Sequence, residues 1–337
     1  MTKIYLIRHG EAEGNVYRRL HGQYNSLLTP NGHKQVAALE KRFADIHIDA
    51  VYSSDLTRTC LTAGALYKPK GLPLQTDPRF RELSCGIWED IPFGQLERED
   101  PERLYTFSHD PWNWQVEGGE NAHVYTGRFL EALEETTLRH EGQTIAIFAH
   151  GMVLRGVLER LFFPKDPKAV GHCENTGVTC ITWEQGEYHL EFLNDASHIP
   201  AEISTLGKQN WWRGNRQMDF NMWFRDAEAQ DAPLLEALGC IRKGWVRISM
   251  LKDMPTGAVV TREADEDTDV LMHLALLPEY RGRGLSPQLI GEAVSHARKN
   301  GKKRLVLGAC ADHPAAKTLF ADYGFCDEGN CLCLYAE

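Results

Sequence analysis

KIYLIRHGEAEGN (residues 3–15) is the stretch that decides the fold of the first part of this 337-residue chain. Its apolar residues 3–8 predict a short buried strand that stops at His9-Gly10. TIAIFAHG (144–151) predicts a second buried strand, which ends in the same way at His150-Gly151. Between and after these strands, the pattern predicts a short strand at 51–52, a hairpin at 177–183 and 187–193, and helices at 31–44, 55–66, 120–139 and 152–162. This alternation predicts a mostly parallel sheet with helices on both faces, a three-layer α/β/α sandwich.

Two histidines from distant parts of the sequence are expected to meet at one edge of this sheet. Ligands of parallel sheets bind beyond the carboxyl ends of the strands, and His9 and His150 each follow a predicted strand directly. Arg8 lies beside His9, and Arg58 follows the strand at 51–52. Because arginine donates paired hydrogen bonds to phosphate oxygens, this edge is predicted to bind a phosphoryl group. Glu82 is a candidate proton donor, provided that burial raises its pKa.

Six segments within residues 1–195 resemble the histidine phosphatase superfamily, the phosphoglycerate-mutase-like group. They follow the family's order at comparable spacings: LIRHGEAEGN (6–15), LLTPNGHKQ (27–35), YSSDLTRTCLTA (52–63), RELSCGIWED (81–90), GGEN (118–121) and FAHGMVLRGVL (148–158). The resemblance implies that His9 becomes phosphohistidine and that Arg8, Arg58 and His150 form the phosphate pocket. Glu82 would act first as acid and then as base for water, Asn15 would contact the phosphate, and no metal would be needed.

The sequence departs from the family's pattern beside this site. His21 and Asn25 stand where family members often carry Gln and Asp, and Leu27 stands where Pro is common. His21 and Gln23 are therefore candidates for contacts with the substrate. The segment 81–90 resembles the phosphatase branch more than the mutase branch, so the expected reaction is hydrolysis of a small phosphomonoester. A phosphosugar mutase stays open as an alternative.

A second set of elements begins near residue 218. The pattern predicts strands at 220–227, 244–251, 257–263, 269–277, 304–311 and 331–335, and helices at 228–238, 285–299 and 314–323. We therefore expect a domain over 1–195, a connector over 196–217 and a smaller α+β domain over 218–337. The connector is expected to be ordered, because Trp211 and Trp212 need a surface to pack against. Trp112 and Trp114 lie in the loop-rich stretch 84–119. The sequence favours neither of two roles for them: contact with the substrate as part of a lid, or packing in the protein interior.

The strand DVLMHLALL (269–277) runs directly into PEYRGRGLSPQLIGEAV (278–294). Glycines that let backbone amides converge at the start of a helix make a binding site for pyrophosphate. The residues placed in this way are Arg281, Gly282, Arg283, Gly284, Leu285 and Ser286. Residues 218–337 resemble GNAT-type N-acetyltransferases, with a second match at DHPAAKTLFADYGF (312–325). The resemblance implies a mixed sheet and an acetyl-CoA site that also includes Leu274, Leu276 and His313.

One position in the second match bears on whether this domain transfers an acetyl group. Phe320 stands where many members carry the tyrosine that protonates the departing thiolate, and phenylalanine has no proton to give. Tyr323 is the candidate replacement. Two hypotheses follow: a phosphatase fused to an N-acetyltransferase that acts on a small amine, or a phosphatase with a non-catalytic module that binds acyl-CoA.

Composition excludes several other classes of protein. The net charge of −10 argues against nucleic acid or an anionic membrane as a partner, and no apolar run approaches the ~20 residues of a membrane span. The N-terminus shows no secretion signal. The 9 cysteines include no C-x-x-C pair and are expected to be reduced thiols of a cytoplasmic protein. Cys326, Cys331 and Cys333 are expected to be small buried residues rather than zinc ligands.

Overall fold

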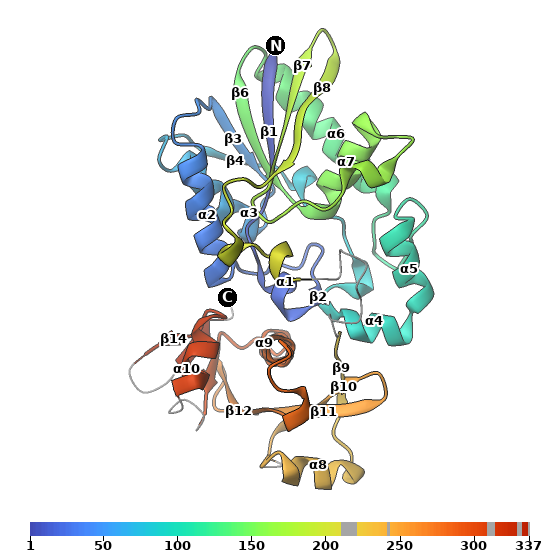
Figure 1. Ribbon diagram of the computed structural model, residues 1–337, viewed down its shortest axis with the longest axis vertical. Coiled ribbons are helices and arrows are strands. Elements are labelled where there is room, and N and C mark those ends of the chain that lie inside the picture. The colour runs from blue at the N-terminus through green and yellow to red at the C-terminus, as the bar shows by residue number, and fades with distance from the viewer. Residues whose placement is uncertain (210–220, 241–242, 309–313, 329–331, 336–337) are drawn as a thin grey trace. The chain divides into compact units, whose positions relative to one another are not determined.

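A computed structural model describes residues 1–209, 221–240, 243–308, 314–328 and 332–335 (Figure 1). Its contacts divide the chain into two compact units. Unit 1 comprises Met1–Ala12, His21–Glu89 and Glu102–Met218, and unit 2 comprises Glu13–Leu20, Asp90–Pro101 and Asp219–Glu337. Two short segments that lie within the first domain by sequence, 13–20 and 90–101, therefore group with the second unit.

A six-stranded sheet forms the centre of unit 1, in the order β4-β3-β6-β1-β7-β8. The strands are β1 (Thr2–Arg8), β3 (Ala50–Ser53), β4 (Leu74–Thr76), β6 (Thr144–Ala149), β7 (Val178–Glu184) and β8 (Glu187–Asp195). The first four of these run parallel, whereas β7 pairs antiparallel with β1 and β8. The predicted strands and hairpin are confirmed. The short β4 was not predicted, because its residues carry no apolar run.

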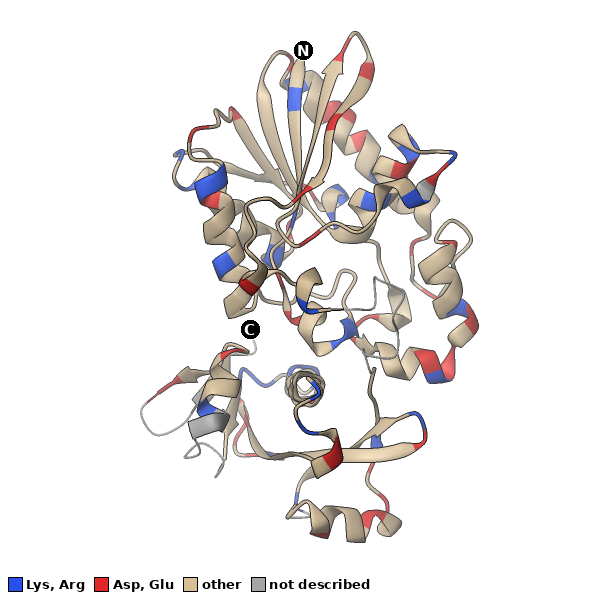
Figure 2. Ribbon diagram, viewed as in Figure 1, with Lys and Arg blue, Asp and Glu red and all other residues tan. Residues whose placement is uncertain are grey.

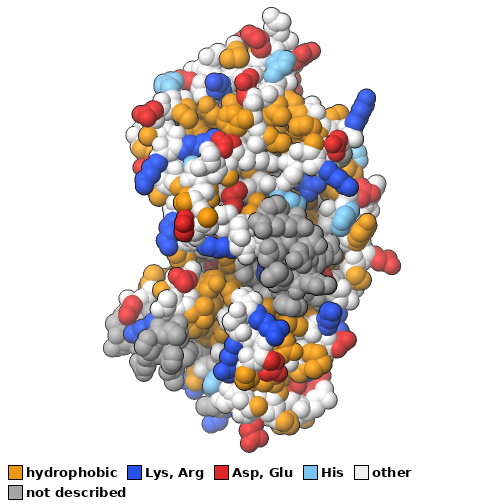
Figure 3. Space-filling view, viewed as in Figure 1, with side chains coloured by type: hydrophobic (Ala, Val, Ile, Leu, Met, Phe, Trp, Pro, Cys, Tyr) orange, Lys and Arg blue, Asp and Glu red, His pale blue; other side chains and the backbone are white. Residues whose placement is uncertain are grey.

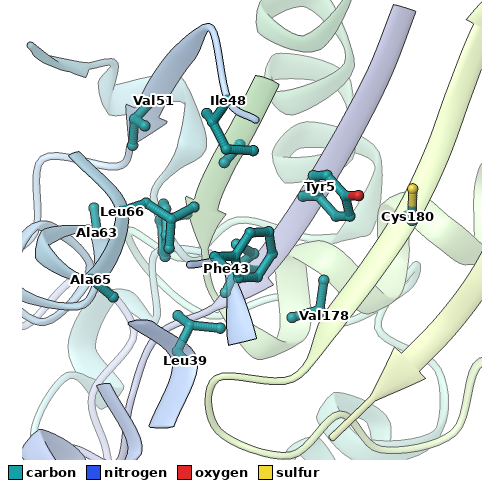
Figure 4. Packing of buried hydrophobic residues seen from close by; sticks show 13 residues of the cluster. Tyr5, Leu39, Phe43, Ile48, Val51, Ala63, Ala65, Leu66, Val178 and Cys180 are labelled. Carbon is teal, nitrogen blue, oxygen red and sulfur yellow. The ribbon is translucent and has the colours of Figure 1, made fainter. Parts of the chain in front are cut away.

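Helices cover both faces of this sheet. α2 (Pro30–Arg42) and α3 (Thr57–Tyr67) cover one face, and α6 (Ala122–Arg139) and α7 (Gly151–Phe162) cover the other (Figure 1). Figure 4 shows Leu39 of α2 and Phe43, which directly follows α2, in one cluster with Leu66 of α3 and Tyr5 of β1. With both faces covered, the central strands are almost free of charged residues (Figure 2). The predicted three-layer sandwich is confirmed.

The start of α2 follows the expected local chemistry. Thr29 caps the helix by accepting a hydrogen bond from the Gly32 amide, and Pro30 occupies the first turn, where it loses no helical hydrogen bond. Thr29 also donates to the Glu11 carboxylate at 2.7 Å. The helix start is thus tied to the segment that directly follows His9.

Short helical elements lie in the loops before and after Glu82. In unit 1 these are η1 (Pro78–Phe80), η2 (Gly86–Trp88) and α5 (Pro101–His109); η3 (Pro167–Val170), η4 (Ala201–Ile203) and η5 (Leu206–Lys208) come later in the chain. Trp114 is buried and packs on Trp88 and Phe107, with ring centroids 5.4 Å and 5.2 Å away. Trp114 is therefore a packing residue of the protein interior.

The connector is docked onto unit 1 as far as it is described. The Ile203 carbonyl accepts hydrogen bonds from Asn31 and Gln35 of α2, at 3.1 Å and 2.7 Å. Thr205 bonds to the same Gln35 and to the Glu11 carboxylate. Trp211 and Trp212 lie outside the described residues.

A seven-stranded mixed sheet forms the centre of unit 2, in the order β14-β15-β13-β12-β11-β10-β9. Its strands are β9 (Trp223–Asp226), β10 (Trp245–Leu251), β11 (Met254–Glu263), β12 (Thr268–Leu276), β13 (Arg304–Leu307), β14 (Cys326–Asp327) and β15 (Leu332–Tyr335). Among the described strands of this sheet, β12 and β13 pair in parallel and the other neighbours pair antiparallel. The helices are α8 (Ala232–Ala237), α9 (Ser286–Lys299) and α10 (Pro314–Ala321), with η7 (Ala229–Asp231) and η8 (Pro278–Tyr280). The predicted mixed-sheet domain is confirmed.

The two segments of unit 2 that come early in the chain pack on α9. They form α1 (Glu13–Tyr17), β2 (Arg19–Leu20), β5 (Ile91–Pro92) and α4 (Phe93–Glu99). Arg19 pairs with Asp90 at 2.7 Å and with Glu292 of α9 at 2.8 Å, and all three side chains are at most 9% exposed. Buried charges persist only when they are paired in this way. Gly291 lets Tyr17 approach, because a Cβ at this position would lie 2.5 Å from the Tyr17 Cβ.

The cysteines near the end of the chain differ from one another. Cys333 is buried, as predicted, but Cys326 is exposed, so that prediction was wrong for Cys326. Cys326 begins β14, the edge strand of its sheet, where one side of the strand faces solvent. Cys331 and Cys310 lie outside the described residues.

Surface charges are mixed on each unit. On the face shown in Figure 3, basic and acidic side chains are interspersed among hydrophobic ones. None of the helices in the described ranges has the length and apolar character needed to cross a membrane.

Candidate active site

The ends of β1 and β6 bring His9 and His150 together. The two strands are parallel neighbours, with Arg8 opposite Ala149, and the His9 amide donates to the Ala149 carbonyl at 3.0 Å. The imidazole centroids of His9 and His150 lie 5.2 Å apart with their planes tilted by 59°. Both rings are buried, at 6% and 0% exposure. Two residues separated by more than 100 positions thus share one small site.

The orientation of His9 is fixed by the next residue. Its Nδ1 lies 2.7 Å from the Gly10 carbonyl oxygen. Because a carbonyl can only accept, this hydrogen bond assigns the ring proton to Nδ1 and leaves the lone pair on Nε2. Burial, followed by the charges of Arg58 and Arg8, holds the pKa of His9 well below 6.5. At neutral pH the ring is therefore uncharged, which is the form that a nucleophile needs.

Arg8 and His150 each present a buried polar atom that makes no hydrogen bond within the part of the chain that the structure describes. Arg8 donates through Nη1 to the Cys173 carbonyl at 2.5 Å, whereas its Nε has no partner among the described residues. His150 is held by Ser54, whose Oγ lies 2.8 Å from Nε2, whereas its Nδ1 has no partner within the described ranges. Buried polar groups are normally hydrogen-bonded. A bound anion would satisfy both atoms.

Gly151 leaves room for Arg8 at this site. A Cβ on Gly151 would lie 3.2 Å from the Arg8 Nε, so a larger residue would crowd the guanidinium. Gly151 is also the first residue of α7, and His150 occupies the N-cap position of that helix. The site therefore lies at a helix N-terminus, where the peptide dipoles favour negative charge.

Arg58 adds a second guanidinium, which is anchored to a loop. It donates to the carbonyls of Tyr24 and Gly22 at 2.8 Å and 2.6 Å. Burial lowers the pKa of Arg58 to about 10, so the side chain keeps its charge at neutral pH. The loop itself is held by Glu89, whose carboxylate accepts from the amides of Gln23 and Tyr24. Arg58 thus contributes positive charge in a fixed position.

Glu82 is held at the same helix N-terminus. Its carboxylate accepts from the amides of Met152 and Val153, at 3.0 Å and 2.8 Å, in the first turn of α7. Burial raises the pKa of Glu82 above 4.5, although these amides and Arg58 pull in the opposite direction. A carboxyl group with a raised pKa is suited to donate a proton and to take one back.

The three residues predicted to contact substrate lie in different surroundings. His21 packs on Tyr24, with ring centroids 4.8 Å apart, and it adds a small contribution to the lowering of the His9 pKa. Gln23 donates to the Glu82 carbonyl at 3.1 Å. Asn15 lies on α1, which belongs to unit 2. Contact of these residues with a substrate stays a prediction.

Sequence reasoning missed two residues that orient this site, Ser54 and Glu89. Ser54 directly follows β3, so the rule that marked His9 and His150 as strand-end residues applied to it as well. Glu89 lies in the segment 81–90, but nothing in its spacing reveals that it holds a loop more than 60 residues earlier in the chain.

In unit 2, the predicted cofactor residues that the structure describes lie on the last part of β12 and at the start of α9. The parallel ladder of β12 and β13 ends at Leu271 and Leu307, so the described part of β13 leaves residues 272–276 of β12 uncovered on that side. Leu274 is half-buried, and Leu276 is buried against Leu285. Backbone groups on such an edge are available to an extended ligand.

The loop that follows β12 has the backbone shape expected of a phosphate-binding turn. Gly282 and Gly284 have φ values of +70° and +72°, which favour glycine, and the space where a Cβ would stand is empty within 4 Å. Leu285 occupies the N-cap position of α9, and its side chain makes no capping hydrogen bond. Arg281 donates to the Leu276 carbonyl at 2.9 Å and so ties the loop to the strand, while Arg283 lies over the Tyr280 ring. These features fit acetyl-CoA.

The positions of Phe320 and Tyr323 bear on whether unit 2 transfers an acetyl group. Phe320 is 3% exposed and packs against Phe325, so it belongs to the hydrophobic core. Tyr323 follows α10 and lies with its ring centroid 6.2 Å from that of Tyr17. His313 lies outside the described residues. A role for Tyr323 as an acid stays a prediction.

Comparison with known families identifies two domains in the chain. Residues 4–196 match the model of the histidine phosphatase superfamily (branch 1), and residues 205–325 match the acetyltransferase (GNAT) family. Phosphoserine phosphatase 1 of Hydrogenobacter thermophilus is 28% identical over 200 residues, which cover 59% of this chain and 95% of that protein. A probable phosphoglycerate mutase, GpmB of Serratia proteamaculans, is 34% identical over 154 residues, which cover 46% of this chain and 72% of the mutase.

Solved structures resemble the first unit in the same way. Bacillus stearothermophilus YhfR matches with a TM-score of 0.57 and 31% identity, covering 59% of this chain and 100% of that one. A mutant phosphoserine phosphatase of Entamoeba histolytica in complex with phosphoserine matches with a TM-score of 0.52 and 25% identity, again over 59% of this chain and 100% of that one. The first family model spans more than half of the sequence. This chain therefore belongs to the histidine phosphatase superfamily (branch 1), and a GNAT-family domain is fused behind its phosphatase domain.

Proposed function

We propose that this protein is a phosphatase that hydrolyses small phosphomonoesters through a phosphohistidine at His9. One observation carries this proposal: Arg8 Nε and His150 Nδ1 are buried without partners among the described residues, beside an imidazole whose Nε2 bears a lone pair. A phosphoryl group would accept hydrogen bonds from both atoms while its phosphorus faces His9.

The proposed reaction has two steps. In the first, His9 Nε2 forms a bond to phosphorus as the ester P–O bond breaks, and Glu82 gives its proton to the departing alcohol oxygen. In the second, the Glu82 carboxylate takes a proton from water, whose oxygen attacks phosphorus as the N–P bond breaks. Inorganic phosphate leaves, and His9 returns to its neutral form. Arg8 and Arg58 balance the charge on the phosphoryl oxygens throughout, and His150 donates a hydrogen bond to them, so that no step requires a metal ion.

The substrate class we propose is a small phosphomonoester that bears an amine. Two of the similar proteins are named as phosphoserine phosphatases, and phosphoserine is such a compound. A mutase is the alternative, because other relatives are named as phosphoglycerate mutases. A phosphatase releases inorganic phosphate, whereas a mutase returns an isomer of the substrate.

Activity of three proteins tests this proposal. The wild type, H9A and the control H33A, whose histidine is exposed on α2, are incubated with phosphoserine and other small phosphomonoesters. We expect H9A to lose phosphate release, and the wild type and H33A to keep it in the presence of a chelator. Equal release by H9A would remove the nucleophile from the proposal, and an isomeric product would favour the mutase.

We propose further that unit 2 binds acetyl-CoA along residues 272–276 of β12, which the described part of β13 does not pair with, and that the pyrophosphate lies at Gly282–Ser286. When bound, acetyl-CoA supplies an activated acetyl group. The chain's own contribution to transfer would be an acid for the thiolate, and the buried Phe320 offers none. Binding measured by calorimetry, without thiol release across a panel of small amines, would identify a binding module; turnover on any amine would identify a transferase.

A further inference from the structure

We infer that Arg128, a residue of α6, is the positioning residue for the catalytic carboxyl group of Glu82. The inference rests on the proposed function, in which Glu82 is the acid and base. Arg128 lies 46 positions from Glu82 in the sequence, and its only sequence signal is an arginine on a helix. Its contacts set it apart from an ordinary surface arginine.

All five hydrogens of the Arg128 guanidinium are used by protein acceptors. Nη1 donates to the carbonyls of Arg79 and Arg81 at 2.7 Å and 2.8 Å, and Nη2 donates to the Glu82 carbonyl at 2.8 Å. Nε and Nη2 donate to the two carboxylate oxygens of Glu120 at 3.0 Å and 2.8 Å. With no donor left, Arg128 is not a phosphate ligand, although it lies close enough to lower the pKa of His150. Its hydrogen bonds instead fix the backbone carbonyls of Arg79, Arg81 and Glu82.

Glu120 fixes the backbone on the other side of Glu82, at Ser84. Its carboxylate accepts from the Ser84 amide at 2.8 Å, and its own amide donates to the Ser84 carbonyl at 2.9 Å. Arg128 lowers the pKa of Glu120, so the carboxylate stays charged. The two side chains are 17% and 19% exposed, which limits screening by water. Together they fix the backbone from Arg79 to Ser84.

We call these contacts of Arg128 and Glu120 with residues 79–84 the clamp. The clamp matters because the backbone and the carboxyl group of Glu82 are held separately. Its carboxyl group is bonded to the first turn of α7, whereas its backbone is bonded to α6 through Arg128. A shift of the backbone would therefore move the carboxyl group relative to the leaving oxygen, and a displacement of about 1 Å can cost roughly 100-fold in rate. Lysine keeps the charge of Arg128, but its three donors on a single nitrogen cannot reach three carbonyls and a carboxylate.

The choice of substrate separates positioning of Glu82 from a general structural role. Formation of the phosphoenzyme from phosphoserine needs an acid, because its leaving group is an alkoxide. Formation from p-nitrophenyl phosphate does not, because nitrophenolate leaves without a proton. Rapid-quench single turnovers with both substrates are measured for the wild type, E82Q, R128K and the control R139K, whose arginine is exposed at the end of α6.

For R128K we expect formation of the phosphoenzyme from phosphoserine to fall by about 10- to 100-fold and formation from p-nitrophenyl phosphate to change by less than about threefold. E82Q should show the same split more strongly, and R139K should show no change. If R128K does not fold, E120Q provides the same comparison, since it keeps the shape of the side chain and weakens the clamp.

Two results would overturn the inference: an equal fall with both substrates, which indicates a structural or electrostatic role, or no fall with either. The proposed function fails separately. If the wild type forms no phosphoenzyme, or if E82Q reacts with phosphoserine like the wild type, then the reaction itself is wrong. If those two behave as proposed and R128K shows no split, only the role of Arg128 is wrong.

Discussion

Replacing His150 by alanine is expected to weaken the binding of inorganic phosphate by about 10- to 150-fold. The reason is the free Nδ1 of this ring, which is fully buried and has no partner among the residues that the structure describes. Ser54 holds the opposite nitrogen at 2.8 Å, so the ring is already oriented before phosphate arrives. Binding therefore gains a hydrogen bond without the entropy cost of ordering the side chain.

The magnitude follows from the kind of hydrogen bond that is lost. A bond to a charged acceptor contributes about 1.5–3 kcal/mol net, and each 1.4 kcal/mol is a factor of ten in the dissociation constant. Alanine removes that bond and leaves a small cavity. S54A should show a smaller loss in the same direction, because the ring remains but its orientation is no longer fixed.

Calorimetric titration with inorganic phosphate at pH 8 measures this effect while the imidazole is neutral. H33A, which changes an exposed histidine in the same unit, serves as the matched control and should bind like the wild type. A dissociation constant for H150A within a factor of two of the wild type would refute the reasoning. His150 would then not contact the bound anion.

Three other predictions concern pH, the buried ion pairs and the cofactor loop. The kcat/KM profile should fall toward acid as His9 becomes protonated below 6.5, and toward alkali as Glu82 loses the proton that its raised pKa retains above 4.5; E82Q should lack the alkaline fall. E292A should lower the free energy of unfolding by about 3–5 kcal/mol in urea titrations, because it leaves the charge of Arg19 partly unpaired. E236A, at an exposed position of α8, should change it by less than about 0.5 kcal/mol. G284A and G301A should both cost roughly 1–2 kcal/mol of stability, since both glycines have positive φ, but only G284A should weaken binding of acetyl-CoA in calorimetry. Unchanged profiles for E82Q, equal stabilities for E292A and E236A, or equal acetyl-CoA affinities for the two glycine variants would each contradict the corresponding argument.

The fold was predictable because its signals are local. A run of apolar residues that stops at a histidine marks β1 and β6, and Thr29-Pro30 marks the start of α2. The short elements α1, β2, β5 and α4 were not predicted, because segments of two to seven residues carry little periodicity. Their grouping with unit 2 rests on contacts between residues far apart in the sequence, of which the pairing of Arg19 with Glu292, 273 positions away, is an example.

The site was predictable only in part, for a related reason. Strand ends and motif spacing indicated His9, His150, Arg8 and Arg58. Glu89 holds the loop that anchors Arg58, and Arg128 holds the backbone of Glu82. Both act on backbone amides or carbonyls, and such contacts leave no pattern in the sequence. Cys326 shows the converse failure: a residue type that is usually buried becomes exposed because its strand lies at the edge of a sheet.

The phosphorylated intermediate provides the most direct test of the proposed chemistry. Wild-type protein is mixed with a labelled phosphomonoester, quenched in alkali, digested and sequenced by mass spectrometry. The phosphoryl group is expected on the peptide that contains His9, on a nitrogen that loses it in acid, and it should be missing in H9A. A label on any other residue, or equal labelling of H9A, would contradict the claim that His9 attacks phosphorus.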